Sequence, residues 1–179
     1  ITGDPKLSPN NSQEVKAATK ISNLNGDEVK IILISQAGSE GIDLKFIRQV
    51  HILEPWYNLS RIEQIIGRAV RNCSHKELPL KERNVQIFLY ASELVDESIE
   101  AADFYVYRLA ERKAIQIGKV TRLLKEISVD CLINKEQMNF IEEKMDSKIQ
   151  QKLSNGKIID YKIGDKPFSA QCDYMESCM

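Results

Sequence analysis

Several features that would assign this chain to a specialised class are missing from its sequence. Its 179 residues contain no apolar run approaching the ~18–20 residues that a membrane-spanning helix needs, so no membrane partner is expected. The first residues do not form the basic-then-apolar pattern of a signal sequence. Charge of one sign is also absent, because 25 Lys and Arg residues oppose 26 Asp and Glu. The net charge of −1 excludes a strongly basic, histone-like protein but allows a locally basic nucleic-acid face.

Cysteine is sparse, and its spacing argues against a zinc ribbon or a disulfide scaffold. The four cysteines, Cys73, Cys131, Cys172 and Cys178, include no C-x-x-C pair. Cys73 and His75 lie close in sequence, but two ligands without a second pair make a weak metal site. We therefore predict no metal site, and free thiols in a reducing compartment.

Three segments in the first 90 residues have the apolar pattern of β-strands. The continuous β-branched run 29–35 is typical of a strand buried on both faces, as in a parallel sheet covered by helices. Shorter apolar runs predict two more strands, over 50–53 and 85–90.

Helical patterns alternate with these strands. The spacing of apolar residues predicts a short helix over 14–24, with Ser12 as its N-cap, and a turn at 25–27. A second helix is expected from 59 to about 72, capped by Asn58 or Ser60. The alternation predicts an α/β fold with a largely parallel sheet flanked by helices, over residues 1–92.

Residues 93–154 are expected to form a C-terminal helical extension, and 155–179 a flexible tail. A long amphipathic helix is predicted over 104–126, with a break near Gly118, and a further helix over about 135–153. The bases of the long helix are either solvated or face a nucleic-acid groove. Its apolar stripe is expected to pack on the α/β core: Tyr107, Ala110, Ala114, Ile117 and Leu124.

The segment 34–44 follows the first predicted strand and is rich in small residues. Two glycines, Gly38 and Gly41, would let the backbone approach a ligand at the carboxyl edge of the sheet. Asp43 could accept hydrogen bonds from a ribose or orient a neighbouring arginine. Taken alone, the pattern is equally typical of a tight turn.

A second chemical signal lies on the predicted helix between the two later strands. Gln64, Arg68 and Arg71 stand at i, i+4 and i+7 and therefore share one face, where Gly67 would allow close approach. Planar guanidinium groups suit phosphate oxygens and can neutralise charge in phosphoryl transfer. The alternative is a solvated face with ion pairs, such as one between Glu63 and Arg71.

Together these segments resemble motifs V, Va and VI of the second RecA-like domain of superfamily 2 helicases. The matching runs are SEGID at 39–43, HILEPWYN at 51–58 and QIIGRAVR at 64–71. The longer run 54–75 resembles the large-DNA-virus helicases of the poxvirus early-transcription-factor type.

The resemblance implies roles for individual residues at an ATP site. Arg68 and Arg71 match arginines that reach the γ-phosphate across an interdomain cleft, and Gln64 matches a glutamine that positions the nucleotide. Three further residues are implied in nucleotide binding: Gly41, Asp43 and Gly67. Nucleic-acid contacts are implied for three others: Ser35, Gly38 and Ser39. Glu40 departs from the family, because RNA-unwinding relatives often have Arg there.

No G-x-x-x-x-G-K-[ST] motif occurs in the chain. The resemblance therefore implies that ATP and Mg²⁺ are bound mainly by an upstream RecA-like domain, and that this chain alone does not hydrolyse ATP. The expected function is the C-terminal part of a nucleic-acid-dependent ATPase or helicase acting in viral transcription. An alternative is a non-hydrolysing RecA-like interaction module of a viral transcription complex. Expected partners are nucleic acid (DNA favoured over RNA), the upstream domain, and viral RNA polymerase or transcription factors, in the virion or the host cytoplasm.

Overall fold

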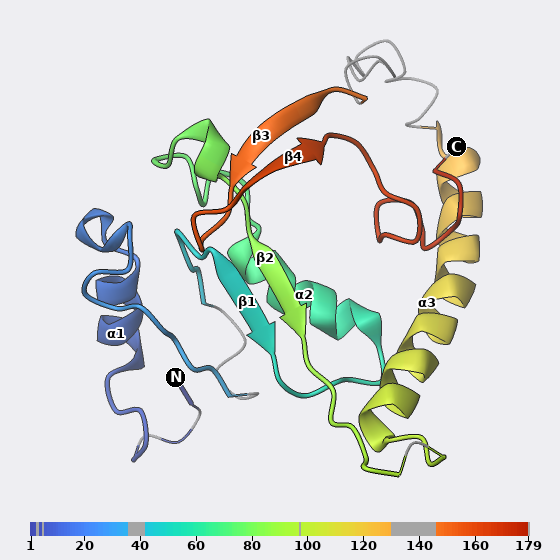
Figure 1. Ribbon diagram of the computed structural model, residues 1–179, viewed down its shortest axis with the longest axis horizontal. Coiled ribbons are helices and arrows are strands. Elements are labelled where there is room, and N and C mark those ends of the chain that lie inside the picture. The colour runs from blue at the N-terminus through green and yellow to red at the C-terminus, as the bar shows by residue number, and fades with distance from the viewer. Residues whose placement is uncertain (3, 5, 36–41, 97, 130–145, 179) are drawn as a thin grey trace. The chain divides into compact units, whose positions relative to one another are not determined.

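A computed structural model describes residues 1–2, 4, 6–35, 42–96, 98–129 and 146–178 (Figure 1). The helices are α1 (Asn11–Ala18), α2 (Leu59–Ala69) and α3 (Ala102–Glu126), with single 3₁₀ turns at Ile21–Asn23 and Leu80–Glu82. The strands form two pairs, β1 (Gln49–Ile52) with β2 (Gln86–Leu89), and β3 (Lys148–Lys152) with β4 (Ile158–Lys162). None of these described helices is long and apolar enough to cross a membrane.

The chain divides into two compact units. The first comprises Ile1–His51, Glu63–Phe88 and Gln151–Ile158, and the second comprises Ile52–Ile62, Leu89–Gln150 and Ile159–Met179. The motif residues Asp43, Gln64, Arg68 and Arg71 all belong to the first unit, and α3 belongs to the second.

The pair β1–β2 is a parallel sheet. Gln86 N donates to Arg48 O at 3.0 Å, and Tyr90 N donates to Ile52 O at 3.0 Å, so the partners advance in the same direction along both strands. Figure 1 shows the two arrows side by side. The predicted strands at 50–53 and 85–90, the helix that begins at Leu59, and the α/β class are confirmed.

The strand predicted over 29–35 is wrong. The sequence predicts a strand buried on both faces, but these residues form no strand. Ile31 and Leu33 are each 76% exposed. Their β-branched composition favours an extended backbone, but a strand also needs a hydrogen-bonded neighbour. Ser35 N donates to Ile1 O at 3.0 Å, and no ladder joins this segment to another strand among the described residues.

Two predicted helices also differ from the structure. The first begins at Asn11, so Ser12 lies inside it instead of capping it, and it ends at Ala18. The second, over 135–153, is contradicted where it is described, because Lys148–Lys152 is a strand; residues 135–145 lie outside the described residues.

The pair β3–β4 is an antiparallel hairpin. Leu153 N donates to Lys157 O at 2.8 Å, and Ile163 N donates to Ser147 O at 2.9 Å. Gly156 has φ +84° in the connecting turn, a conformation that favours glycine. The sequence predicted 155–179 as a flexible tail, but its described part contains β4. The domain divisions at residues 92 and 154 stay predictions.

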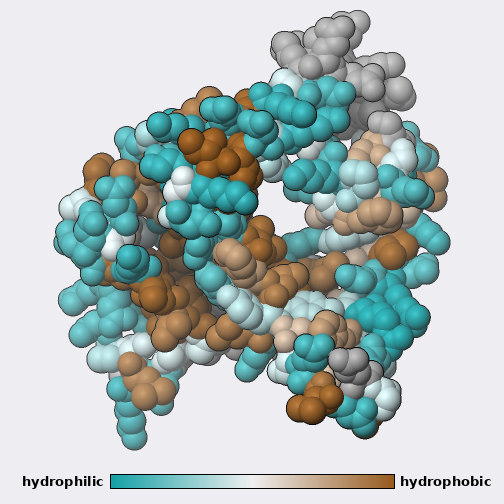
Figure 2. Space-filling view, in the orientation of Figure 1, coloured by the Kyte–Doolittle hydropathy of each residue, from teal (hydrophilic) through white to brown (hydrophobic). Residues whose placement is uncertain are grey.

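Helix α3 runs unbroken through Gly118 for 25 residues, so the predicted long helix is confirmed and its break is not found. Its buried positions are Ala110, Ala114 and Gly118, which recur every four residues. Ile117 and Leu124 were predicted in the buried stripe but are 62% and 59% exposed. The helix therefore buries its small residues and leaves larger apolar ones at the surface, where Figure 2 shows hydrophobic patches.

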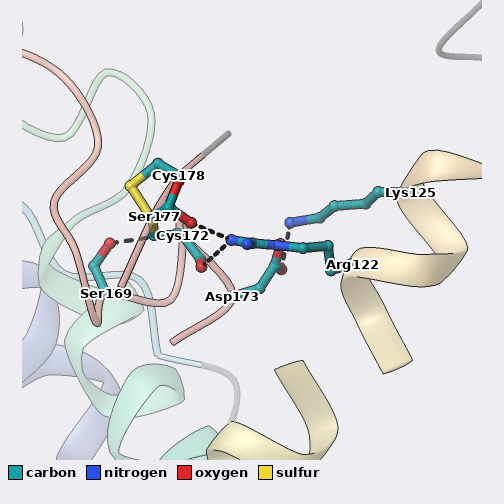
Figure 3. The surroundings of a disulfide bond; sticks show 7 residues. All are labelled: Arg122, Lys125, Ser169, Cys172, Asp173, Ser177 and Cys178. Atoms are coloured by element: carbon teal, nitrogen blue, oxygen red, sulfur yellow. Dashed lines mark hydrogen bonds and ion pairs between the residues drawn. A yellow bond between two sulfur atoms is a disulfide. The ribbon is translucent and has the colours of Figure 1, made fainter. Parts of the chain in front are cut away.

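The C-terminal segment approaches α3 closely at the buried glycine. A Cβ added at Gly118 would lie 2.0 Å from the backbone oxygen of Asp173. Arg122 Nη2 donates to the carbonyls of Cys172 and Ser177, each at 2.7 Å, and Lys125 Nζ donates to Asp173 Oδ1 at 2.6 Å (Figure 3). The Asp173 carboxylate forms ion pairs with Arg122 and Lys125. Because its side chain is only 6% exposed, solvent and salt screen these two ion pairs less than they screen surface pairs.

The expectation of free thiols is wrong for two of the four cysteines. Cys172 and Cys178 form a disulfide that closes the loop held by Arg122 (Figure 3). These two cysteines are six residues apart, and no short sequence motif marks such a pair. Cys73 is free and exposed, and Cys131 lies outside the described residues.

The close approach at α3 predicts that Gly118→Ala lowers the free energy of unfolding by about 1–3 kcal/mol. The added methyl overlaps the backbone of Asp173, which outweighs the ~1 kcal/mol that alanine gains over glycine in a helix. Chemical denaturation followed by circular dichroism measures the change. The matched control is Ile117→Ala on the exposed face, expected within about ±0.5 kcal/mol. A Gly118→Ala variant as stable as the parent would contradict this packing.

Candidate nucleotide-contacting site

Helix α2 carries three of the predicted site residues, Gln64, Gly67 and Arg68, and has an amphipathic pattern. Ile62 and Ala69 are buried, whereas Gln64 is exposed and Arg68 half-buried. Arg71 is exposed and lies two residues beyond Ala69, the last helical residue. Helical geometry alone therefore places Gln64 and Arg68, but not Arg71.

Both arginines contact the segment that precedes β1. Arg68 Nη1 donates to the carbonyl of Ile42 at 3.2 Å, and Arg71 Nη1 donates to Asp43 Oδ1 at 2.9 Å. The Asp43 carboxylate thus orients a neighbouring arginine, one of the two uses foreseen for it. The Arg71–Asp43 pair is about half exposed on both sides, so its contribution to stability is small. Each guanidinium has five N–H groups, and each donates one hydrogen bond to the described residues.

Glu63 is not the partner of Arg71 that the sequence suggested. Its Oε1 is buried and has no hydrogen-bond partner among the described residues. Burial raises the pKa of the Glu63 carboxyl above its ordinary value, because the charged form loses hydration.

Gly67 stands in open space on α2. A Cβ added there would meet no atom within 4 Å. Nothing in the described chain therefore requires glycine at this position, whereas the interior of a helix normally disfavours it. The open space suits the close approach of another molecule, as the motif implied.

The predicted nucleic-acid contacts are mostly not described. Ser35 is exposed, and its backbone N is bonded to Ile1 O. Gly38, Ser39 and Gly41 lie outside the described residues. Their implied roles, like those of the arginines and Gln64, stay predictions. No three His, Cys, Asp or Glu side chains of the described chain are grouped so that they could hold a metal ion.

Ser74 and His75 hold the end of this site, a role that the sequence motif does not indicate. Ser74 is 4% exposed, and its hydroxyl lies 3.2 Å from Ala69 O and 2.9 Å from Arg71 O. His75 has Nδ1 at 2.8 Å from that hydroxyl and Nε2 at 2.7 Å from the carbonyl of Ile47. From the sequence, His75 is a candidate only for a weak metal site with Cys73. The available signal was a serine five residues after a helix end, where side-chain hydroxyls can bond the last carbonyls.

Comparison with known proteins agrees with this geometry. Residues 6–73 match the family described as "Helicase conserved C-terminal domain". A mimivirus protein provisionally named as ATP-dependent RNA helicase R350 is 41% identical over 120 residues, which are 64% of this chain and 15% of that protein. Residues 6–73 are a helicase C-terminal domain. The predicted resemblance to superfamily 2 helicases of large DNA viruses is confirmed.

Other relatives of this helicase domain come from the same group of viruses. The termination factor NPH-I homolog of African swine fever virus is 37% identical over 124 residues, covering 64% of this chain and 18% of that protein. A helicase of Invertebrate iridescent virus 3, also provisionally named, is 32% identical over 152 residues, covering 82% of this chain and 15% of that protein. The chain spans less than a fifth of the length of these relatives.

The open position on α2 gives a test that separates fold from function. Gly67→Ala should raise the free energy of unfolding by up to about 1 kcal/mol, because alanine favours a helix and its methyl meets no atom. If a nucleotide or a second domain approaches Gly67, the same variant should lower ATP turnover of the full-length protein. Denaturation and steady-state ATPase assays measure the two effects. Loss of stability would contradict the open geometry, and unchanged turnover would exclude a close approach there.

Proposed function

We propose that this chain is the C-terminal part of a nucleic-acid-dependent ATPase or helicase that acts in viral transcription. The observation that carries the proposal is the placement of Arg68 and Arg71 against Ile42 and Asp43. Two guanidinium groups then lie at one end of α2, each with N–H donors to spare. A transferring γ-phosphoryl group, with charge on its oxygens, is the kind of ligand that such donors suit.

In this proposal the arginines act only when ATP is brought to them. They stabilise charge that develops on the γ-phosphate, Gln64 orients the nucleotide, and Asp43 keeps Arg71 from swinging into solvent. Among the described residues, no group of three His, Cys, Asp or Glu side chains could hold Mg²⁺. ATP and Mg²⁺ are assigned mainly to an upstream RecA-like domain.

The polymer is proposed as single-stranded nucleic acid. The sequence favoured DNA over RNA, but the names of relatives do not support that preference, since R350 is named as an RNA helicase. The similarity to a termination factor homolog supports a partner in the viral transcription machinery, such as RNA polymerase. ATPase stimulation by single-stranded DNA and by RNA of the same sequence, compared side by side, decides which polymer acts.

The virion or the cytoplasmic virus factory is the proposed location. Disulfides persist in virions but are rare in a reducing cytosol. In protein recovered from infected cells, a disulfide between Cys172 and Cys178 would favour the virion, and two free thiols would favour the cytoplasm.

The arginine role predicts a selective loss of turnover in the full-length protein. Arg68→Lys and Arg71→Lys should each keep nucleotide and nucleic-acid binding and lower ATPase kcat by a factor on the order of 10³, since lysine lacks the planar fork. Equilibrium binding and steady-state ATPase assays measure the two properties.

Lys81→Ala is the matched control for charge, because it removes an exposed cation outside the motif. Full turnover in both arginine variants would rule out catalytic arginines on α2. A full-length protein without any ATPase activity would favour the non-hydrolysing interaction module instead.

A further inference from the structure

We infer that His75, acting with Ser74, is a positioning residue that holds Arg71 in place for the nucleotide. The inference rests on the proposed function, because it matters only if Arg71 contacts the nucleotide. Both residues lie outside the recognised arginine motif.

Arg71 needs such support because α2 does not hold its backbone. The last backbone hydrogen bond of the helical type is donated by Val70 to Ile66 O at 2.9 Å. Beyond it, the backbone N–H of Ser74 donates to Arg71 O at 3.1 Å and closes a turn. The position of Arg71 therefore depends on a turn closed by Ser74.

His75 anchors that turn to the strand side of the site. The carbonyl of Ile47 can only accept, so Nε2 of His75 carries the hydrogen and donates to it at 2.7 Å. In the neutral imidazole Nδ1 is then an acceptor, and the Ser74 hydroxyl donates to it at 2.8 Å. The imidazole thus fixes both the Ser74 side chain and its distance from Ile47.

The backbone closes the same link. Phe46 N donates to Ser74 O at 3.3 Å, so the turn is bonded to two successive residues of the segment that also carries Asp43. Phe46 has φ +63° and Cys73 has φ +60°, a conformation rarely adopted by such side chains. Residues held this way persist only where the surrounding contacts fix them, and they cluster at functional sites. Hydrogen bonds of Ser74 and His75 therefore link the turn that carries Arg71 to the segment that carries Asp43.

The test uses ATPase kinetics of the full-length protein. His75→Ala should lower kcat about 10- to 100-fold, as expected when a catalytic group is displaced by about 1 Å, while the KM for ATP changes less than about threefold. His75→Gln keeps an N–H donor for Ile47 O and should stay within about threefold of the parent kcat. Lys76→Ala, at the exposed neighbour whose Nζ lies 3.6 Å from Glu77 Oε1, should leave turnover unchanged. Thermal unfolding of each variant shows that all are folded.

A double-mutant cycle with Arg71→Lys identifies the route of the effect. If His75 acts through Arg71, adding His75→Ala to Arg71→Lys should lower the residual kcat by no more than about twofold. Full multiplication of the two losses, or failure of His75→Gln to rescue, would overturn the positioning role and leave the arginine role intact. Full turnover in Arg71→Lys alone would overturn the proposed function and this inference with it.

Discussion

The return of the chain beyond α2 is the constraint on which the candidate site depends. Carbonyl groups at and beyond a helix end lack the partners of the helix interior, and here the backbone N–H of Ser74 donates to the carbonyl of Arg71 at 3.1 Å. His75 then ties this end to the carbonyl of Ile47. Because a buried hydroxyl or imidazole left unbonded costs free energy, these bonds specify one path for the chain. That path brings Arg71 within 2.9 Å of Asp43.

In the second unit, close packing of backbone against α3 accompanies the side-chain contacts. Ala110, Ala114 and Gly118 make a face on α3 without bulk, so that a backbone can lie directly against it. The buried carboxylate of Asp173 then faces Arg122 and Lys125, which offset its lost hydration. Larger apolar residues of α3 remain outside, so hydrophobicity alone does not say which face of this helix is covered.

This contrast explains what could be predicted from the sequence. The strands near 50 and 86, the start of α2 and the length of α3 follow from local periodicity, which the chain encodes directly. The run 29–35 misled because its β-branched pattern is local, whereas strand formation depends on a neighbour. The helix predicted over 14–24 is too long, because α1 ends at Ala18. Beyond it, the Asn23 side chain bonds Ala18 O, Val29 O and the amides of Glu28 and Val29. A buried asparagine with four hydrogen bonds has no sequence pattern of its own.

In the candidate site too, some positions follow from local periodicity and others depend on contacts of the folded chain. Gln64 and Arg68 share a face because a helix repeats every 3.6 residues, so spacing alone groups them. Arg71 fits that spacing in the sequence but lies outside the helix, where two residues with positive φ and a histidine set its position. Neither Phe46 nor Cys73 is a residue type that signals a left-handed backbone. The arginine motif could therefore be recognised from its letters, whereas the contacts that aim its second arginine required the folded chain.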